Sequence, residues 1–156
     1  MRELQSADLP QLRRILVATE AFTAVEVECA VELLEIVLKD PQQQDYQVIV
    51  AEHEGAVAGY VLYGAVPLTE GNYDLYWIAT DPALHGKGAG RKLMEETEQR
   101  LRQAGARLLC LETSSQGSYV RTRRFYEQAG YLEESCIRDF YRPGDDRITY
   151  VKRFNY

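Results

Sequence analysis

The sequence predicts a single α/β domain with a mixed β-sheet over residues 1–156. The length suits one domain, and 46% hydrophobic with 27% charged residues is a globular composition. Segments of helical period alternate with segments of extended period, and no repeat, linker or low-complexity segment separates them. A nearly continuous apolar run, Leu108–Leu111, follows a predicted helix, as in a βαβ unit whose parallel strand is covered on both faces. The predicted order is β-α-α-β-β-β-α-β-α-β-β.

The first elements are a short strand and two helices. The strand is predicted at Arg2–Gln5, and a helix over Ser6–Thr19 starts at a capping serine and repeats its apolar residues at i, i+3 and i+4. Thr23 is the candidate N-cap of the second helix, because Glu26 follows three residues later as in a capping box. Pro41 ends that helix.

Three strands follow, because the apolar period changes from helical to extended. Val48–Ala51 and Val57–Val66 form a hairpin, and a third strand runs over Asn72–Thr80. By strict alternation, one face of the third strand would carry Tyr73, Leu75 and Trp77.

The second half contains two helices and three strands. The glycine-rich segment His85–Gly90 opens a helix that ends near Ala104, before Gly105. The remaining elements are, in order, the strand Leu108–Leu111, a helix over Ser118–Ala129, and a hairpin of the strands Tyr131–Tyr141 and Arg147–Phe154.

Charge and cysteine usage exclude several classes of protein. There are 18 Lys and Arg residues against 24 Asp and Glu, and a net charge of −6 disfavours a nucleic-acid partner. The three cysteines are widely spaced, so neither a disulfide framework nor a metal site is expected. The N-terminal residues do not resemble a secretory signal, and the longest apolar stretch, Ala56–Leu68, is too short to span a bilayer. We therefore expect a cytoplasmic protein with no membrane partner.

The strongest functional signal is the segment His85-Gly86-Lys87-Gly88-Ala89-Gly90. Glycines at a helix start let backbone N–H groups approach a phosphate at the positive end of the helix dipole. The segment is not a Walker loop, because no G-K-[ST] follows, and Arg91 and Leu93 break the dinucleotide pattern G-x-G-x-x-G. A glycine-rich turn without a ligand is the alternative.

Read as H-G-K-G-A-G, this segment resembles the pyrophosphate loop of the GNAT superfamily of acyl-CoA-dependent N-acetyltransferases, Gln/Arg-x-x-Gly-x-Gly/Ala, with His85 at the Gln/Arg position. Trp77–Pro82 resembles the strand before that loop, and Phe125–Tyr131 resembles the F-Y-E-x-x-G-F/Y helix end. The motif style is closest to the ribosomal-protein alanine acetyltransferases. The resemblance covers nearly the whole chain. It implies acetyl-CoA as cosubstrate and a primary amine, on a small molecule or a peptide, as acceptor.

The resemblance also implies a cofactor site where two parallel strands splay at their C-terminal ends. The thioester would lie there, the glycine segment would bind the pyrophosphate through its backbone, and Arg91 and Arg123 are the candidates for side-chain contacts with phosphate. Thr122 stands where many relatives have an asparagine that contacts pantetheine. The implied cofactor-binding residues are Ile78, Ala79, Thr80, His85, Gly86, Lys87, Gly88, Ala89, Gly90, Arg91, Ser114, Thr122, Arg123, Phe125 and Tyr126.

Two proton-handling groups are needed, because an amine must lose a proton to attack and the departing thiolate gains one. The resemblance implies Glu112 as base and Tyr126 as acid. Asp74, on the polar face of the third strand, could act as base through water instead. Packing in the core is the alternative for Tyr126. For Glu112 the alternative is capping a helix or pairing with Arg107 or Arg123.

The acceptor is not identified by any motif. The helices within Ser6–Lys39, the loop Pro67–Tyr73 and the turn Tyr141–Arg147 are expected to shape its pocket. A non-catalytic acyl-CoA-binding regulatory module is the main alternative function, and the negative charge argues against a toxin that acetylates aminoacyl-tRNA. Thr149–Phe154 could pair across a homodimer, as final strands often do in this superfamily.

Overall fold

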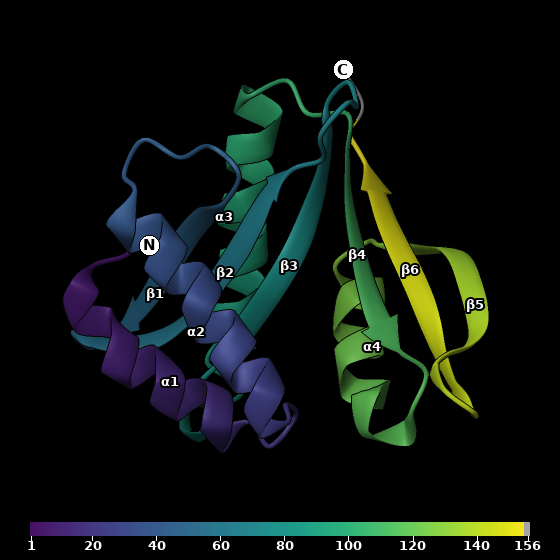
Figure 1. Cartoon of the computed structure of the whole chain (residues 1–156), viewed down its shortest axis with the longest axis horizontal. Helices are drawn as coiled ribbons and strands as arrows, with labels where there is room; N and C mark the ends of the chain where they lie inside the picture. Colours follow the sequence, from purple (N-terminus) through teal and green to yellow (C-terminus); the bar gives the residue numbers. More distant parts are fainter. Residues whose placement is uncertain (155–156) are drawn as a thin grey trace.

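The computed structural model describes residues 1–154, which form one mixed sheet flanked by helices (Figure 1). Within these residues the strand order is β1-β2-β3-β4-β6-β5, and only β3 and β4 pair in parallel. The elements are α1 (Leu9–Ala18), α2 (Ala24–Lys39), β1 (Gln47–His53), β2 (Ala56–Ala65), β3 (Asn72–Thr80), α3 (Ala89–Gln103), β4 (Leu108–Ser114), α4 (Val120–Gln128), β5 (Leu132–Arg142) and β6 (Asp145–Arg153). The predicted mixed α/β architecture is confirmed.

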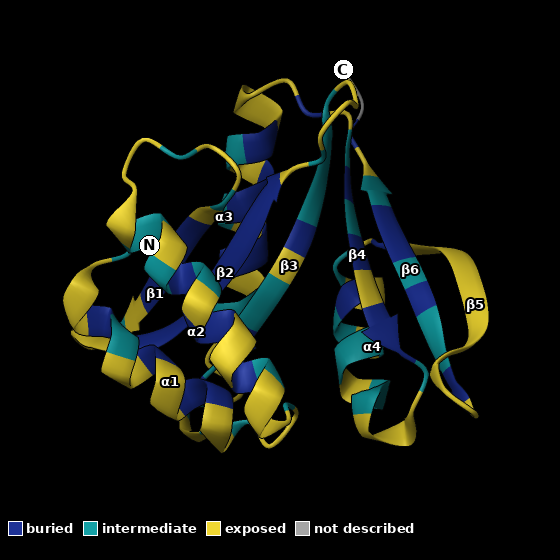
Figure 2. Ribbon diagram, in the orientation of Figure 1, coloured by how far each residue is buried: buried dark blue, intermediate teal, exposed yellow. Residues whose placement is uncertain are grey.

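The helices cover the two faces of the sheet unequally. One core lies between α3, α4 and the sheet, and it includes Leu93, Met94 and Tyr126. The second core lies under α1 and α2 and includes Leu12 and Leu34, but its strand residues come only from β1, β2 and β3. The strand β5, at the edge of the sheet, is exposed along its whole length (Figure 2). Consequently, within residues 1–154 no helix covers the second face of β4, β6 and β5.

This unequal cover corrects one prediction about β4. Leu109 and Leu111 are buried in the core against α3 and α4, whereas Cys110 and Glu112 on the other face are partly or fully exposed. The apolar run was expected to be covered on both faces, but α1 and α2 do not extend over this half of the sheet. Among the described residues, no helix has both the length and the hydropathy needed to cross a bilayer.

The N-terminus shows one confirmed and one wrong prediction. Thr23 caps α2, because its hydroxyl accepts a hydrogen bond from the Glu26 N–H at 3.2 Å. The strand predicted at the N-terminus is reduced to a single bridge between Arg2 and Val50. The reason is Asp8, whose carboxylate accepts two hydrogen bonds from the Arg2 guanidinium and one from the Gln5 N–H, so the chain turns into a 3₁₀ helix there.

A β-bulge in β3 overturns the expected alternation. Leu62 of β2 is paired with Trp77 and Tyr63 with Leu75, so Tyr76 is an extra residue. An extra residue moves every later side chain to the opposite face of the sheet. Trp77 therefore packs in the α1–α2 core, whereas Leu75 packs in the α3–α4 core.

The parallel strands separate early. Pairing between β3 and β4 covers only Asn72–Asp74 with Leu108–Cys110, and beyond these residues the ribbons diverge toward their C-terminal ends (Figure 1). We call this separation the splay. The family resemblance implied such a splay, and it brings the end of β3, the end of β4 and the start of α3 to one end of the molecule.

Candidate active site

Asp81 fixes the turn that leads into the glycine segment. Its carboxylate accepts hydrogen bonds from Arg14 Nη2 at 2.9 Å and from the Ala83 N–H at 3.0 Å, which caps the 3₁₀ helix Pro82–Leu84. The hydrogen bond from Arg14 is the main reason that the pKa of Asp81 is lowered. Because Arg14 lies on α1, this ion pair attaches the N-terminal helices to the loop.

Gly86 and Gly88 shape the loop itself. Both have left-handed φ values, +82° and +80°, and a Cβ atom at either position would meet nothing within 4 Å. The first hydrogen bond of α3 runs from the Lys92 N–H to the Gly88 carbonyl at 3.0 Å. The N–H groups of residues 89–91 thus remain available, as they do at any helix start. This arrangement fits a pyrophosphate group.

Three of the predicted cofactor segments meet beside this loop. A Cβ atom at Gly90 would lie 3.4 Å from Phe125 of α4 and 3.7 Å from Thr80 of β3. β3 is paired with β2 as far as Thr80, but its pairing with β4 ends at Asp74. In the described residues, the edge of β3 beyond Asp74 therefore has no strand partner. An open strand edge suits the two amides of pantetheine.

Tyr126, on α4, packs into the core between the helices and the sheet. Its side chain is 5% exposed, and its ring lies 5.5 Å from Phe125, 6.1 Å from Tyr131 and 6.2 Å from Tyr150, centroid to centroid. Burial raises the pKa of the Tyr126 phenol. The hydroxyls of Tyr131 and Tyr150 donate to carboxylates at 3.0 and 2.9 Å, but that of Tyr126 has no such partner among the described residues. The hydroxyl of Tyr60, a core residue of β2, also has no partner among the described residues, so the unbonded hydroxyl of Tyr126 is compatible with core packing as well as with an acid role.

Asp74 and Glu112 lie on the same face of the sheet. Their neighbours Leu75 and Leu111 point into the α3–α4 core, so alternation directs both carboxylates to the opposite face. Asp74 is paired with Cys110, and Glu112 is the next residue of β4 on that face. Burial, followed by the charge of Glu112, raises the pKa of Asp74. The two candidate bases are thus neighbours at the start of the splay.

Glu112 has a different cationic neighbour from those considered in the sequence. Arg147 Nη1 lies 3.7 Å from its carboxylate. Arg107 instead donates to a carbonyl of the β2–β3 loop at 2.6 Å, and Arg123 donates to carbonyls of the β4–α4 connection. Neither of the two ion pairs considered as alternatives for Glu112 forms.

Ser114 and Arg123 hold the connection after β4. Arg123 Nη1 donates to the carbonyl oxygens of Ser114 at 2.8 Å and Gln116 at 2.9 Å. Ser114 Oγ donates to the carboxylate of Asp145 and accepts from the Gln116 N–H at 3.1 Å. These bonds compete with the predicted contacts of both side chains to the cofactor, which stay predictions.

The other predicted cofactor residues differ in exposure. His85 and Lys87 are exposed, and Arg91 is exposed and bonded at 2.8 Å to a glutamate one helical turn later. Ala79 is buried under α1 and α2, so only its backbone can face the open edge of β3. Thr122 is partly buried on α4. The loop is therefore expected to bind mainly through its backbone.

Two contacts around the splay were not predicted from the sequence. The Tyr119 hydroxyl donates to the Ala21 carbonyl at 3.0 Å, which links the β4–α4 connection to the α1–α2 loop. Arg147 stacks on Phe140, with 4.4 Å between the guanidinium carbon and the ring centroid. No local pattern signals either contact, because each depends on how distant elements pack.

One predicted acceptor segment lies away from the wide end of the splay. The loop Pro67–Tyr73 leads into β3 at the end where β3 and β4 still pair, and its Gly71 lies close to the Arg107 backbone. The α1–α2 loop and the β5–β6 turn, by contrast, lie near the C-terminal ends of the strands (Figure 1). These two segments therefore flank the wide end.

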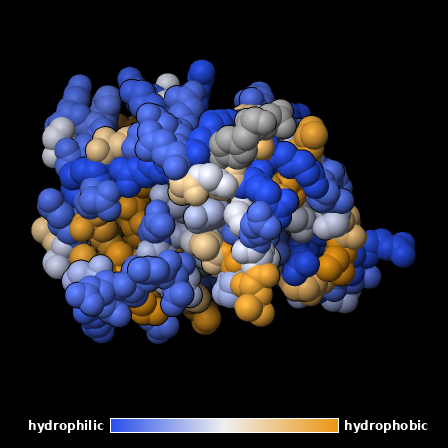
Figure 3. All heavy atoms as spheres, turned by 90° about the horizontal axis from the view of Figure 1, so that it is seen from above, coloured by the Kyte–Doolittle hydropathy of each residue, from blue (hydrophilic) through white to orange (hydrophobic). Residues whose placement is uncertain are grey.

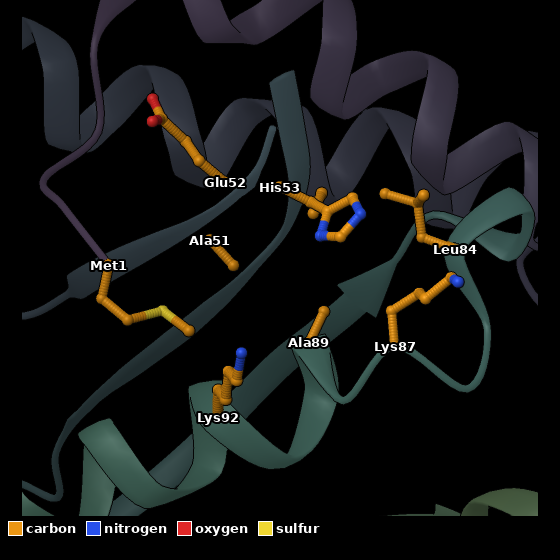
Figure 4. Close-up of a pocket in the computed structure, with 9 residues that line it drawn as sticks. Met1, Ala51, Glu52, His53, Leu84, Lys87, Ala89 and Lys92 are labelled. Atoms are coloured by element: carbon orange, nitrogen blue, oxygen red, sulfur yellow. The ribbon is translucent and has the colours of Figure 1, made fainter. Parts of the chain in front are cut away.

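Two hollows lie elsewhere on the molecule. A cavity of about 20 Å³ lies behind the glycine segment, and Figure 4 shows the His53 ring and the Lys92 amine directed into it. This volume holds about one water molecule, not a cofactor. A groove of about 490 Å³ between α2 and β1 includes Leu38 and Tyr46, and Figure 3 shows hydrophobic atoms in a hollow on that side. Neither hollow includes a residue of the splay.

Comparison with known proteins agrees with this geometry. Residues 10–131 match the family described as Acetyltransferase (GNAT) family. Over 105 residues, 67% of this chain, the sequence is 30% identical to an uncharacterized N-acetyltransferase of Methanocaldococcus jannaschii. The matched stretch spans 64% of that relative.

Solved structures show the same fold over nearly the whole chain. A GNAT-family protein from Desulfovibrio desulfuricans is 40% identical, with a TM-score of 0.94 and coverage of 98% of this chain and 96% of that one. A ribosomal-protein-alanine N-acetyltransferase from Brucella melitensis is 25% identical, with a TM-score of 0.75 and 98% coverage of both chains. A structure from Salmonella typhimurium with its cofactor acetyl-CoA is 20% identical and shares the fold, with a TM-score of 0.75 and coverage of 99% and 93%. From its motifs, its splayed parallel strands and these matches, we conclude that the chain belongs to the GNAT acetyltransferase family.

Proposed function

We propose that this protein is an acetyl-CoA-dependent N-acetyltransferase that transfers the acetyl group directly to a primary amine. The observation that carries the proposal is the position of the glycine segment next to the unpaired edge of β3. Gly88 starts the anion-binding helix end, and Thr80 ends the open edge that would pair with pantetheine. A pyrophosphate and a peptide-like arm therefore find adjacent sites.

The reaction joins the amine nitrogen to the thioester carbonyl carbon and breaks the carbon–sulfur bond. One proton leaves the amine, and one proton goes to the departing thiolate. Tyr126 is the proposed donor to the thiolate, because its hydroxyl has no partner among the described residues and burial keeps its phenol protonated. No covalent enzyme intermediate is needed, since the amine attacks the thioester itself.

Asp74 and Glu112 are the candidates for the base that accepts the proton from the amine. Asp74 is partly buried and its pKa is raised, while Glu112 is exposed and lies 3.7 Å from Arg147. Variants separate them. If Asp74 is the base, Asp74→Asn removes the acidic limb of the kcat/KM profile, whereas Glu112→Gln shifts that limb to lower pH, because one neighbouring negative charge is lost.

The decisive experiment measures free thiol released from acetyl-CoA in the presence of amines. Calorimetry with acetyl-CoA alone tests binding separately. Thiol release with an amine supports the proposal. Binding of acetyl-CoA without turnover of any amine would favour the alternative, a non-catalytic acyl-CoA-binding module.

A further inference from the structure

The glycine segment is attached to the rest of the fold through Asp81. Asp81 is 7% exposed, and its N–H donates to the Ala58 carbonyl of β2 at 2.8 Å. Residues 82–88 are all partly or fully exposed, and Gly86 and Gly88 add conformational freedom that packing does not remove. The shape of the segment therefore depends on its two ends, which are Asp81 and the start of α3.

The turns that begin at Asp81 use some N–H groups of the segment and leave others available. The Ala83 N–H donates to the Asp81 carboxylate at 3.0 Å, and the Leu84 N–H donates to the Asp81 carbonyl at 2.9 Å. The Lys87 N–H then donates to the Leu84 carbonyl at 3.1 Å. Within residues 1–154, the N–H groups of this stretch that have no hydrogen-bond partner are those of Gly86, Gly88 and residues 89–91. These are the groups that could face a phosphate.

Arg14 orients the carboxylate on which these turns depend. Arg14 Nη2 donates to Oδ2 of Asp81 at 2.9 Å, whereas the Ala83 N–H donates to Oδ1. One oxygen thus binds α1 and the other binds the segment. α1 is itself fixed, because Ile15 and Leu16, which follow Arg14, are fully buried in the α1–α2 core. Since the two carboxylate oxygens rotate together, a charge-assisted bond to one of them also sets the direction of the other.

From these bonds we propose that Arg14 and Asp81 form a positioning pair that holds the glycine segment in its phosphate-binding shape. The affinity of the protein for acetyl-CoA then depends on an ion pair with the first helix, although neither side chain contacts the cofactor. This inference rests on the proposed function, and it adds two residues that no part of the glycine motif contains.

Calorimetric titration with acetyl-CoA tests the pair in a double-mutant cycle. Arg14→Met should weaken acetyl-CoA binding by about 5-fold, and Asp81→Ala by about 10-fold or more, because a less ordered segment must be fixed on binding. In the Asp81→Ala background, Arg14→Met should have no further effect, because Arg14 acts only through Asp81. Arg14→Lys should bind acetyl-CoA within about 2-fold of the wild type, since Arg14 uses one nitrogen for this bond.

Arg13→Met is the matched control, because Arg13 is the preceding residue of α1. Its side chain is 44% exposed, against 53% for Arg14, and it pairs with Glu28 of α2 instead of with the glycine segment. Thermal melts should show similar changes in melting temperature for Arg13→Met and Arg14→Met. Only Arg14→Met should weaken acetyl-CoA binding. If Asp81→Ala is too unstable to titrate, the three single arginine variants still decide the question.

Three results would overturn the inference while the proposed function stands. They are wild-type acetyl-CoA affinity in Arg14→Met, equal losses of affinity in Arg13→Met and Arg14→Met, and a further loss from Arg14→Met in the Asp81→Ala background. The last result would show that Arg14 contacts the cofactor itself. A wild-type protein that does not bind acetyl-CoA would overturn the proposed function, and this inference with it.

Discussion

Replacement of Tyr126 by phenylalanine separates packing from catalysis at the residue proposed as acid. The ring contacts with Phe125, Tyr131 and Tyr150 remain, and no hydrogen bond to a described residue is lost. The free energy of unfolding should therefore change by less than about 0.5 kcal/mol. Turnover should fall by about 100-fold, the scale of general acid catalysis.

Tyr131→Phe is the matched control, because it removes a hydroxyl from the same aromatic cluster. The Tyr131 hydroxyl donates to the buried carboxylate of Glu98 at 3.0 Å. Its removal leaves a buried carboxylate oxygen with one partner fewer, which costs about 1–3 kcal/mol. At about 2–4 °C of melting temperature per kcal/mol for a domain of this size, the loss is easily measured. Turnover of Tyr131→Phe should stay within about 3-fold of the wild type, since this hydroxyl is already bonded.

The assay is single-turnover thiol release with enzyme in excess over acetyl-CoA, so that product release does not limit the rate. Thermal melts of both variants supply the stability comparison. The two variants should differ in opposite ways. Tyr126→Phe should have a lower turnover rate but wild-type stability, and Tyr131→Phe should have nearly wild-type turnover but lower stability. Wild-type single-turnover rates in Tyr126→Phe would refute the acid role, and a large loss of stability in that variant would show that its hydroxyl has a structural partner.

Three further predictions concern the loop, the cofactor and the N-terminus. Gly88→Val should lower acetyl-CoA affinity by calorimetry at least about 10-fold, because a branched side chain would occupy the open space before the loop. The control is Gly105→Val, at φ +77° beyond the other end of α3, which carries the same backbone strain and should leave acetyl-CoA affinity unchanged. Equal losses of acetyl-CoA affinity in the two variants would contradict binding of the pyrophosphate by the glycine segment. Acetyl-CoA at about 100 times its Kd should raise the free energy of unfolding by about 2.7 kcal/mol. A rise in melting temperature with ATP or NAD but not with acetyl-CoA would contradict the assignment of the glycine segment to acetyl-CoA. Asp8→Asn should lower the free energy of unfolding by about 1–3 kcal/mol at pH 7. The Arg2 hydrogen bonds lower the pKa of Asp8 in the folded state. The ionised Asp8 side chain therefore stabilises the folded protein fully at pH values above its unfolded-state pKa, near 4. This stabilisation is lost as pH falls through the folded-state pKa. The stabilities of the two proteins should therefore begin to converge below about pH 4 and become equal once pH falls below the folded-state pKa of Asp8, and a constant difference would count against this ion pair.

Local sequence signals determined the helices, most of the strands and the glycine-rich loop of this protein. The Thr23 cap with Glu26 marks the start of α2, because capping involves only residues within one turn. Gly86 and Gly88 were identifiable because a left-handed backbone before a helix is a property of the glycines themselves. The order of strands and helices followed from apolar periods, which are equally local.

Only the tertiary structure decided which side chains face the splay. Pairing with β2 inserts Tyr76 as an extra residue and moves Trp77 to the opposite face, and no pattern within β3 signals this. The proximity of Asp74 and Glu112 depends on the short parallel register between β3 and β4, and the bond from Tyr119 to Ala21 depends on how the two halves of the molecule pack. Capping and backbone conformation are set by neighbours in sequence, whereas register and inter-element contacts are set by the balance of packing over the whole sheet. For this reason the sequence predicts the residue types of the site, and the fold alone determines which of them meet.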